Sequence, residues 1–87
     1  MNFKIEDSAS FSEVITWEKI IEFARVSGDT NPIHLDAEYA KTTRFKGCIA
    51  HGVIIDAMIS RVLGTIFPGR GAILLSLSTR YLNPVYP

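Results

Sequence analysis

The sequence predicts an α+β fold in which a sheet wraps around one long, buried helix. Three segments indicate this arrangement. Residues 50–67 are apolar on almost all sides, as in a helix that other elements cover. Residues 72–82 alternate between apolar and polar side chains with the period of a strand. Residues 11–15 suggest a further strand that enters the domain, although their alternation is weak.

A first, amphipathic helix is expected between Thr16 and Gly28. Threonine is a common N-cap, and glycine readily adopts the left-handed conformation in which many helices end. Four apolar residues between these ends recur at helical spacing and form one stripe: Trp17, Ile20, Ile21 and Ala24.

The chain between the two helices is expected to be mostly irregular. Asn31 precedes Pro32 and is biased away from helical backbone, so residues 29–36 are predicted to form a loop. Asp36 is a candidate cap for a short helix that continues to Lys41. Pro68-Gly69 is expected to end the long helix, and Asn83-Pro84 the strand after it.

Composition describes one small globular domain, residues 1–87. The chain has 47% apolar residues, and nine Lys plus Arg balance nine Asp plus Glu, which argues against a disordered chain and against a nucleic-acid partner. A domain of this size buries only about 60% of its unfolded surface. Because a single cysteine excludes an intrachain disulfide, we expect a homodimer or higher oligomer.

The N-terminus and the free thiol bear on the compartment. Residues 1–10 have no apolar core of a signal peptide, and no segment has the ~18–20 apolar residues of a membrane-spanning helix. A free Cys48 fits a reducing environment. We therefore expect a cytoplasmic protein without a membrane partner.

The densest polar cluster, residues 27–34, contains Asp29 and His34. Pro32 restricts the backbone between them, so both side chains can converge on one site. A carboxylate and an imidazole can hold one water and pass protons in both directions. The spacing alone, however, favours an Asx-turn at Asp29 and a surface histidine at His34.

A second cluster, residues 48–52, lies at the start of the long helix. The free N–H of Gly52 could polarise a carbonyl oxygen, and glycine allows a ligand to approach the backbone closely. His51 and Gly52 could equally form a plain helix entry. Cys48 is a poor candidate for a thiol–imidazole pair with His51, because beside Ile49 it is expected to pack as a small apolar side chain. A metal site made from Asp29, His34, Cys48 and His51 is conceivable but lacks standard zinc spacing.

Polar residues on the long helix need partners. Asp56 and Ser60 stand four residues apart, hence on one face, and are expected to satisfy each other, bond to nearby backbone or line a pocket. Four cationic residues are candidates for phosphate contact, although each alone is a typical surface charge: Arg44, Lys46, Arg70 and Arg80.

Taken together, these motifs resemble the MaoC-like (R)-specific enoyl-CoA hydratases. The most specific element is Gly-Asp-x-Asn-Pro-x-His at residues 28–34, followed at the right distance by Ala-His-Gly at residues 50–52. The resemblance covers nearly the whole chain from Phe11 onward and also includes residues 43–45, 63–64, 68–69 and 81–85.

The resemblance implies a hot-dog fold, an antiparallel sheet wrapped around a central helix at residues 52–67, in domains that usually dimerise. It implies that Asp29 and His34 activate a water that adds to C3 of a trans-2-enoyl-CoA while a proton goes to C2, giving the (R)-3-hydroxyacyl product. The Gly52 N–H would bind the thioester oxygen, with Asn31, His51 and Ser60 in supporting roles. No metal or cofactor is implied, because coenzyme A belongs to the substrate.

Family members continue beyond the position of Pro87 with further strands, so we expect residues 1–87 to be a hot-dog domain without its C-terminal strands. Two alternatives therefore stay open. One is a dehydratase that acts on acyl-carrier-protein thioesters. The other is a non-catalytic acyl-binding or assembly half-domain that needs a partner chain. A thioesterase explains the loop of Asp29 and His34 less well.

Overall fold

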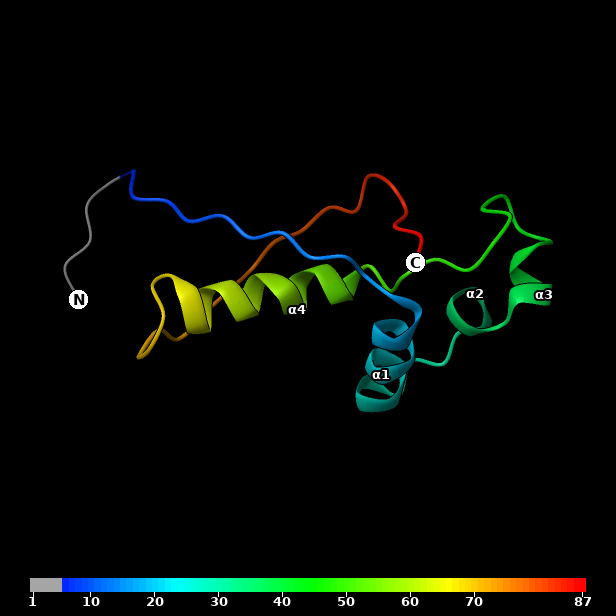
Figure 1. Ribbon diagram of the computed structural model, residues 1–87, viewed down its shortest axis with the longest axis horizontal. Coiled ribbons are helices and arrows are strands. Elements are labelled where there is room, and N and C mark those ends of the chain that lie inside the picture. Colours follow the sequence, from blue (N-terminus) through cyan, green and yellow to red (C-terminus); the bar gives the residue numbers. More distant parts are fainter. Residues whose placement is uncertain (1–5) are drawn as a thin grey trace.

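A computed structural model describes residues 6–87 of the chain. The elements follow one another as α1 (Trp17–Ser27), α2 (Pro32–Leu35), α3 (Ala37–Ala40), α4 (Val53–Arg61) and η1 (Val62–Ile66). The last is a π-helical continuation of α4, so the two form one rod (Figure 1). None of the helices in the described part of the chain is long and apolar enough to cross a membrane.

Helix α1 has the predicted bounds because both of its ends are capped. The Thr16 hydroxyl accepts a hydrogen bond from the Lys19 N–H, and Gly28 ends the helix in the left-handed conformation with φ 77°. The Gly28 N–H donates to Ala24 O at 2.9 Å. The caps thus direct the chain out of the helix immediately before Asp29.

The loop predicted for residues 29–36 is partly wrong, because Pro32–Leu35 forms the helical turn α2. Asn31 still lies outside the helix, as the residue before a proline should. Its side chain accepts a hydrogen bond from the Ile33 N–H and caps the turn, while Pro32 supplies a helical φ at the first position. Asp36 then caps α3, as predicted, by accepting from two backbone N–H groups.

The rod of α4 and η1 matches the predicted long helix in extent but not in burial. Within the described residues, only Ile54 of α4 is fully buried. It joins a small core with Ile15, Ile20 and Ala50, against which five partly buried residues pack: Phe23, Leu35, Ile55, Met58 and Val85. Residues 9–15 run beside the rod and leave an apolar groove of about 470 Å³.

Neither predicted strand is formed within residues 6–87. Residues 11–15 and 72–82 run along the rod without strand pairing (Figure 1). A strand exists only when its backbone groups bond to a neighbouring strand. Here only isolated hydrogen bonds join the C-terminal segment, residues 72–87, to the rest of the described chain, for example that from the Ala50 N–H to Val85 O at 2.8 Å. Apolar side chains such as Leu75, 92% exposed, consequently remain uncovered.

Candidate active site

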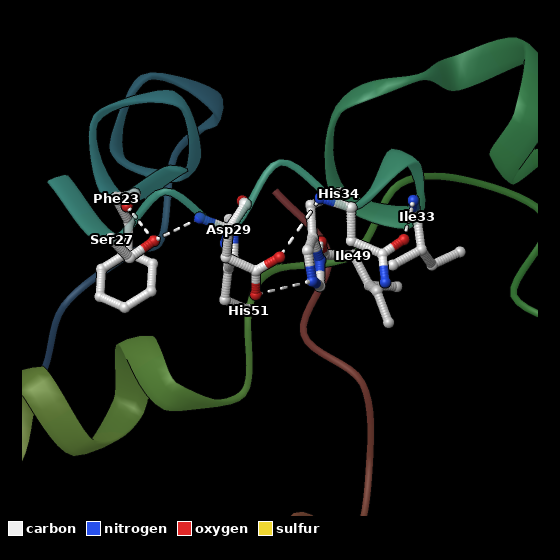
Figure 2. A network of polar contacts seen from close by, with 8 residues as sticks. Phe23, Ser27, Asp29, Ile33, His34, Ile49 and His51 are labelled. Carbon is white, nitrogen blue, oxygen red and sulfur yellow. Dashed lines mark hydrogen bonds and ion pairs between the residues drawn. The ribbon is translucent and has the colours of Figure 1, made fainter. Parts of the chain in front are cut away.

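The loop after α1 fixes Asp29 through a chain of local hydrogen bonds (Figure 2). The Ser27 hydroxyl donates to Phe23 O at 2.6 Å and accepts from the Asp29 N–H at 3.1 Å. Asp29 Oδ1 accepts from the Asn31 N–H at 3.2 Å. This is the Asx-turn considered from the sequence, and it uses only one carboxylate oxygen. The turn therefore leaves Oδ2 available and holds it in one direction.

His34, carried by α2, faces that oxygen. Its side chain is buried rather than on the surface, and Nδ1 lies 2.8 Å from Ile49 O. Because a carbonyl oxygen only accepts, Nδ1 must carry the proton, which leaves a lone pair on Nε2 of the neutral ring. Nε2 lies 4.0 Å from Asp29 Oδ2. The structure thus brings together the two side chains that the sequence singled out.

His51 contacts both Asp29 and His34. It is 2% exposed, and its Nε2 donates to the backbone carbonyl of Asp29 at 3.0 Å. Its ring stacks on that of His34 with centroids 3.9 Å apart and makes a T-shaped contact with the ring of Phe23, with centroids 4.9 Å apart. Its Nδ1 is buried without a hydrogen-bond partner in the described chain. A residue that only precedes a helix does not need these contacts. We therefore count His51 among the residues of the site.

Gly52 lies at the N-terminus of α4, where no side chain caps the helix. Its N–H donates to no acceptor within residues 6–87. A Cβ at this position would lie 2.9 Å from Cδ2 of Tyr81. The observed need for glycine is therefore the packing of Tyr81 on the backbone, whereas the sequence suggested the approach of a ligand.

A cavity of about 360 Å³ lies beside the two histidines and Gly52. It is lined by His34, His51, Gly52 and Tyr81, among others. Two formally charged side chains line it, and both are arginines: Arg44 and Arg80, two of the four candidates for phosphate contact. The chain has no net charge, but this cavity is edged by cations and suits an anionic ligand.

The sequence did not single out Tyr81 as a functional residue, although it lies in the resembling segment 81–85. Its hydroxyl donates to Asp56 Oδ2 at 2.7 Å, and this hydrogen bond is the main reason that the pKa of Tyr81 is raised above 10. Asp56 thus bonds to Tyr81 and not to Ser60. The buried polar position at Asp56 signalled a partner, but no local pattern points to a residue 25 positions away.

The other predicted residues lie outside the pair. Ser60 is exposed on α4, eight residues after Gly52 and hence about 12 Å along the helix. Asn31 acts as the cap of α2. Cys48 is a partly buried free thiol. The structure therefore brings neither Ser60 nor Cys48 into the cluster of Asp29, His34 and His51.

That cluster also meets a distance criterion for metal binding. Asp29, His34 and His51 each offer one ligand atom, and these atoms lie within 4.8 Å of one another. Each imidazole already donates one N–H to a backbone carbonyl. The two ring planes are within 27° of parallel, so their in-plane lone pairs do not converge well on one ion. This ring geometry therefore does not favour coordination of one ion by both histidines.

Comparison with known proteins shows the family to which the chain is related. The family profile described as "MaoC like domain" matches residues 4–87. An (R)-specific enoyl-CoA hydratase of Rhodospirillum rubrum is 45% identical over 84 residues, which are 97% of this chain and 58% of that protein. A mitochondrial 3-hydroxyacyl-[acyl-carrier-protein] dehydratase of Arabidopsis thaliana is 35% identical over 95% of this chain and 49% of its own length.

The fold is found in solved structures. An R-hydratase of Pseudomonas aeruginosa in its unliganded form superposes with a TM-score of 0.89 and 43% identity, covering 95% of this chain and 54% of that one. The predicted hot-dog class is therefore confirmed, although residues 6–87 contain no paired strand. The chain spans a little over half the length of these hydratases.

Proposed function

Because this chain belongs to the MaoC-like domain family, we propose that the protein hydrates trans-2-enoyl-CoA to (R)-3-hydroxyacyl-CoA and catalyses the reverse dehydration. The observation that carries this proposal is the pair of Asp29 Oδ2 and His34 Nε2, 4.0 Å apart and close to a helix N-terminus with a free N–H. The (R) configuration rests on the names of the related hydratases.

The separation of the pair fits a single water molecule. Two hydrogen bonds of about 2.8 Å to atoms this far apart meet at the water oxygen at about 90°, near the angle between water's own O–H bonds. Both protein atoms accept, so the water donates one proton to Asp29 and one to His34. Its oxygen lone pairs then face away from the pair, and the proposed reaction requires that they face a substrate in the cavity that His34 lines.

Addition of this water proceeds with one proton transferred and returned. As the water oxygen bonds to C3 of the enoyl thioester, its proton passes to His34 Nε2, and the C2=C3 electrons move toward the thioester carbonyl. The carboxylate of Asp29 stabilises the imidazolium that forms. Nε2 then returns the proton to C2, so one water is added across the double bond and the ring is again neutral.

Gly52 supports the negative charge that develops on the thioester oxygen. The free N–H at the N-terminus of α4 carries the partial positive charge of a helix end. A donor held in place before the reaction stabilises an enolate-like transition state without reorganisation. The proposed chemistry uses only the thioester, water and these groups, with coenzyme A as part of the substrate.

The acyl carrier is the main open choice within this reaction. A dehydratase acting on acyl-carrier-protein thioesters is the second candidate, favoured by the Arabidopsis relative. The two arginines at the cavity favour a phosphate-bearing carrier, and both coenzyme A and a phosphopantetheine arm have phosphate. Comparing kcat/KM for the same enoyl group on the two carriers distinguishes them.

A non-catalytic acyl-binding half-domain is the alternative of a different class. Loss of the enoyl ultraviolet absorbance with a short trans-2-enoyl-CoA tests it, with Asp29→Asn as the matched variant. The amide can still accept from the Asn31 N–H, so the turn is kept while the charge is removed. We expect the variant to lose about 10²–10⁴-fold in turnover with little change in KM. Equal rates in parent and variant would exclude the proposed role of Asp29.

The wider setting is also proposed. We place the protein in the cytoplasm, in keeping with the free thiol of Cys48, and expect it to act as a homodimer or higher oligomer. Sedimentation analysis of the purified protein tests this oligomeric state. A monomer at working concentration would contradict it.

A further inference from the structure

We propose that Tyr81, held by Asp56, is a positioning residue that fixes the wall of the cavity beside the Gly52 N–H and so orients the thioester. This inference rests on the proposed function, because it concerns the same cavity. It gives a joint role to two residues, Asp56 and Tyr81, that the sequence did not pair.

The ring of Tyr81 lies directly on the backbone of Gly52. Three ring carbons would be 2.9–3.1 Å from a Cβ at that position, so the ring fills the space that a side chain would take. Tyr81 also lines the cavity together with His34 and His51. The place of this ring therefore decides how much room a thioester has next to the N–H.

Few contacts hold the ring in place. The C-terminal segment has no strand pairing within residues 6–87. Three hydrogen bonds with other parts of the described chain tether its second half: Tyr81 Oη to Asp56 Oδ2 at 2.7 Å, Ala50 N to Val85 O at 2.8 Å and Tyr86 Oη to Phe45 O at 2.8 Å. Only the first acts on the residue that covers Gly52.

Asp56 depends on this contact as well. Its Oδ1 is buried without a partner in the described residues, so the bond from Tyr81 to Oδ2 is the one that satisfies the carboxylate. Asp56 lies in the first turn of α4, where a negative charge is favourable. The negative charge of Asp56 lies one turn from the Gly52 N–H and therefore repels an oxyanion that develops there. The hydrogen bond from the Tyr81 hydroxyl offsets part of this repulsion. A phenol with the ordinary pKa of about 10 is protonated at neutral pH, and the hydrogen bond to Asp56 raises the pKa of Tyr81 further.

Two matched substitutions separate positioning from general tethering. Tyr81→Phe keeps the ring over Gly52 but removes its hydrogen bond, and Tyr86→Phe removes another tether of the same segment. The readouts are kcat/KM for a short trans-2-enoyl-CoA and the calorimetric Kd of butyryl-CoA, a saturated thioester that cannot be hydrated. We expect Tyr81→Phe to lose about tenfold in both and Tyr86→Phe less than about twofold.

Asp56→Asn tests whether the hydrogen bond or the charge matters. The amide oxygen can still accept from the Tyr81 hydroxyl, so we expect it to keep butyryl-CoA binding within about threefold. Equal losses in the two tyrosine variants, or a loss in Asp56→Asn without one in Tyr81→Phe, would overturn the proposal. Failure of the parent to hydrate an enoyl-CoA would instead overturn the proposed function, while butyryl-CoA binding would still decide the role of Tyr81.

Discussion

The loop that carries Asp29 and His34 and the C-terminal segment are built in opposite ways. Short-range bonds fix the loop: the Ser27 hydroxyl, the Asx-turn at Asp29 and the cap at Asn31 each span two to four residues. Within residues 72–82 the one comparable short-range bond is from the Ala72 N–H to Gly69 O at 3.0 Å, and the large apolar side chains after it are exposed. A reactive loop can thus take its shape from local sequence, whereas a strand takes its shape from a partner.

The largest effect is expected from a substitution that removes the base, His34, and keeps the local structure of the loop. In His34→Asn the amide nitrogen can replace Nδ1 as donor to Ile49 O, but nothing replaces the lone pair of Nε2. We expect kcat to fall by about 10²–10⁴-fold with a much smaller change in KM. Steady-state kinetics with a circular-dichroism check of folding measure this. A loss confined to KM would show that His34 binds substrate without transferring a proton.

The next test concerns the long-range support of the loop. His51→Phe keeps an aromatic ring against His34 but removes the hydrogen bond to the carbonyl of Asp29. His51→Gln is the control, since its amide can donate in place of Nε2. We expect the phenylalanine variant to lose about tenfold in kcat, and the glutamine variant to lose less. The reverse order would mean that ring stacking, and not the hydrogen bond, positions the loop.

A third test joins the two regions where they touch. Gly52→Ala places a methyl group 2.9 Å from the Tyr81 ring, so we expect a loss of about 1–3 kcal/mol in the free energy of unfolding. Gly64→Ala is the control, because nothing lies within 4 Å of that position. It should be neutral or stabilising by up to about 1 kcal/mol, as alanine favours helices. Chemical denaturation of both variants measures the two free energies of unfolding. Equal values would mean that the Tyr81 ring moves away from the added methyl group at no cost.

The sequence predicted those parts of the molecule that depend on near neighbours. The caps at Thr16, Gly28 and Asp36 follow from residue type, and the structure contains all three. The spacing of Asp29 and His34 allowed them to converge but by itself favoured a surface histidine, and the buried position of His34 also depends on its contact with Ile49 O, 15 residues away. The error at Pro32, predicted as loop but found as a helical turn, arose because a capped proline can begin a helix as well as break one.

The contacts that could not be predicted are those between distant segments. His51 reaches Asp29 across 22 residues, and Tyr81 reaches Asp56 across 25. Both depend on how α4 packs against its surroundings, which no local pattern states. The prediction of a strand at residues 72–82 was wrong for the same reason. The alternation of side chains shows only that one face should be covered, and it does not supply a neighbouring strand with which the backbone can pair.

The smallest expected effect is a pH dependence of the contact between the C-terminal segment and α4. The pKa of Tyr81 is raised in the folded protein, first by the hydrogen bond to Asp56, then by desolvation and the negative charge of Asp56. The protonated phenol is the form that donates, so its contribution to stability is fully present below the unfolded pKa of about 10 and is lost as pH rises through the folded value.

The difference in unfolding free energy between the parent and Tyr81→Phe should therefore be constant from pH 7 to about 9 and shrink above about 10. Urea denaturation at each pH measures it. The same comparison in an Asp56→Ala background is the control, and there the difference should change far less, because no carboxylate faces the phenol. A difference that stays constant through the alkaline range in the parent would mean that the phenol does not donate to Asp56 in solution. The C-terminal segment would then lie on α4 by ring packing on Gly52 alone.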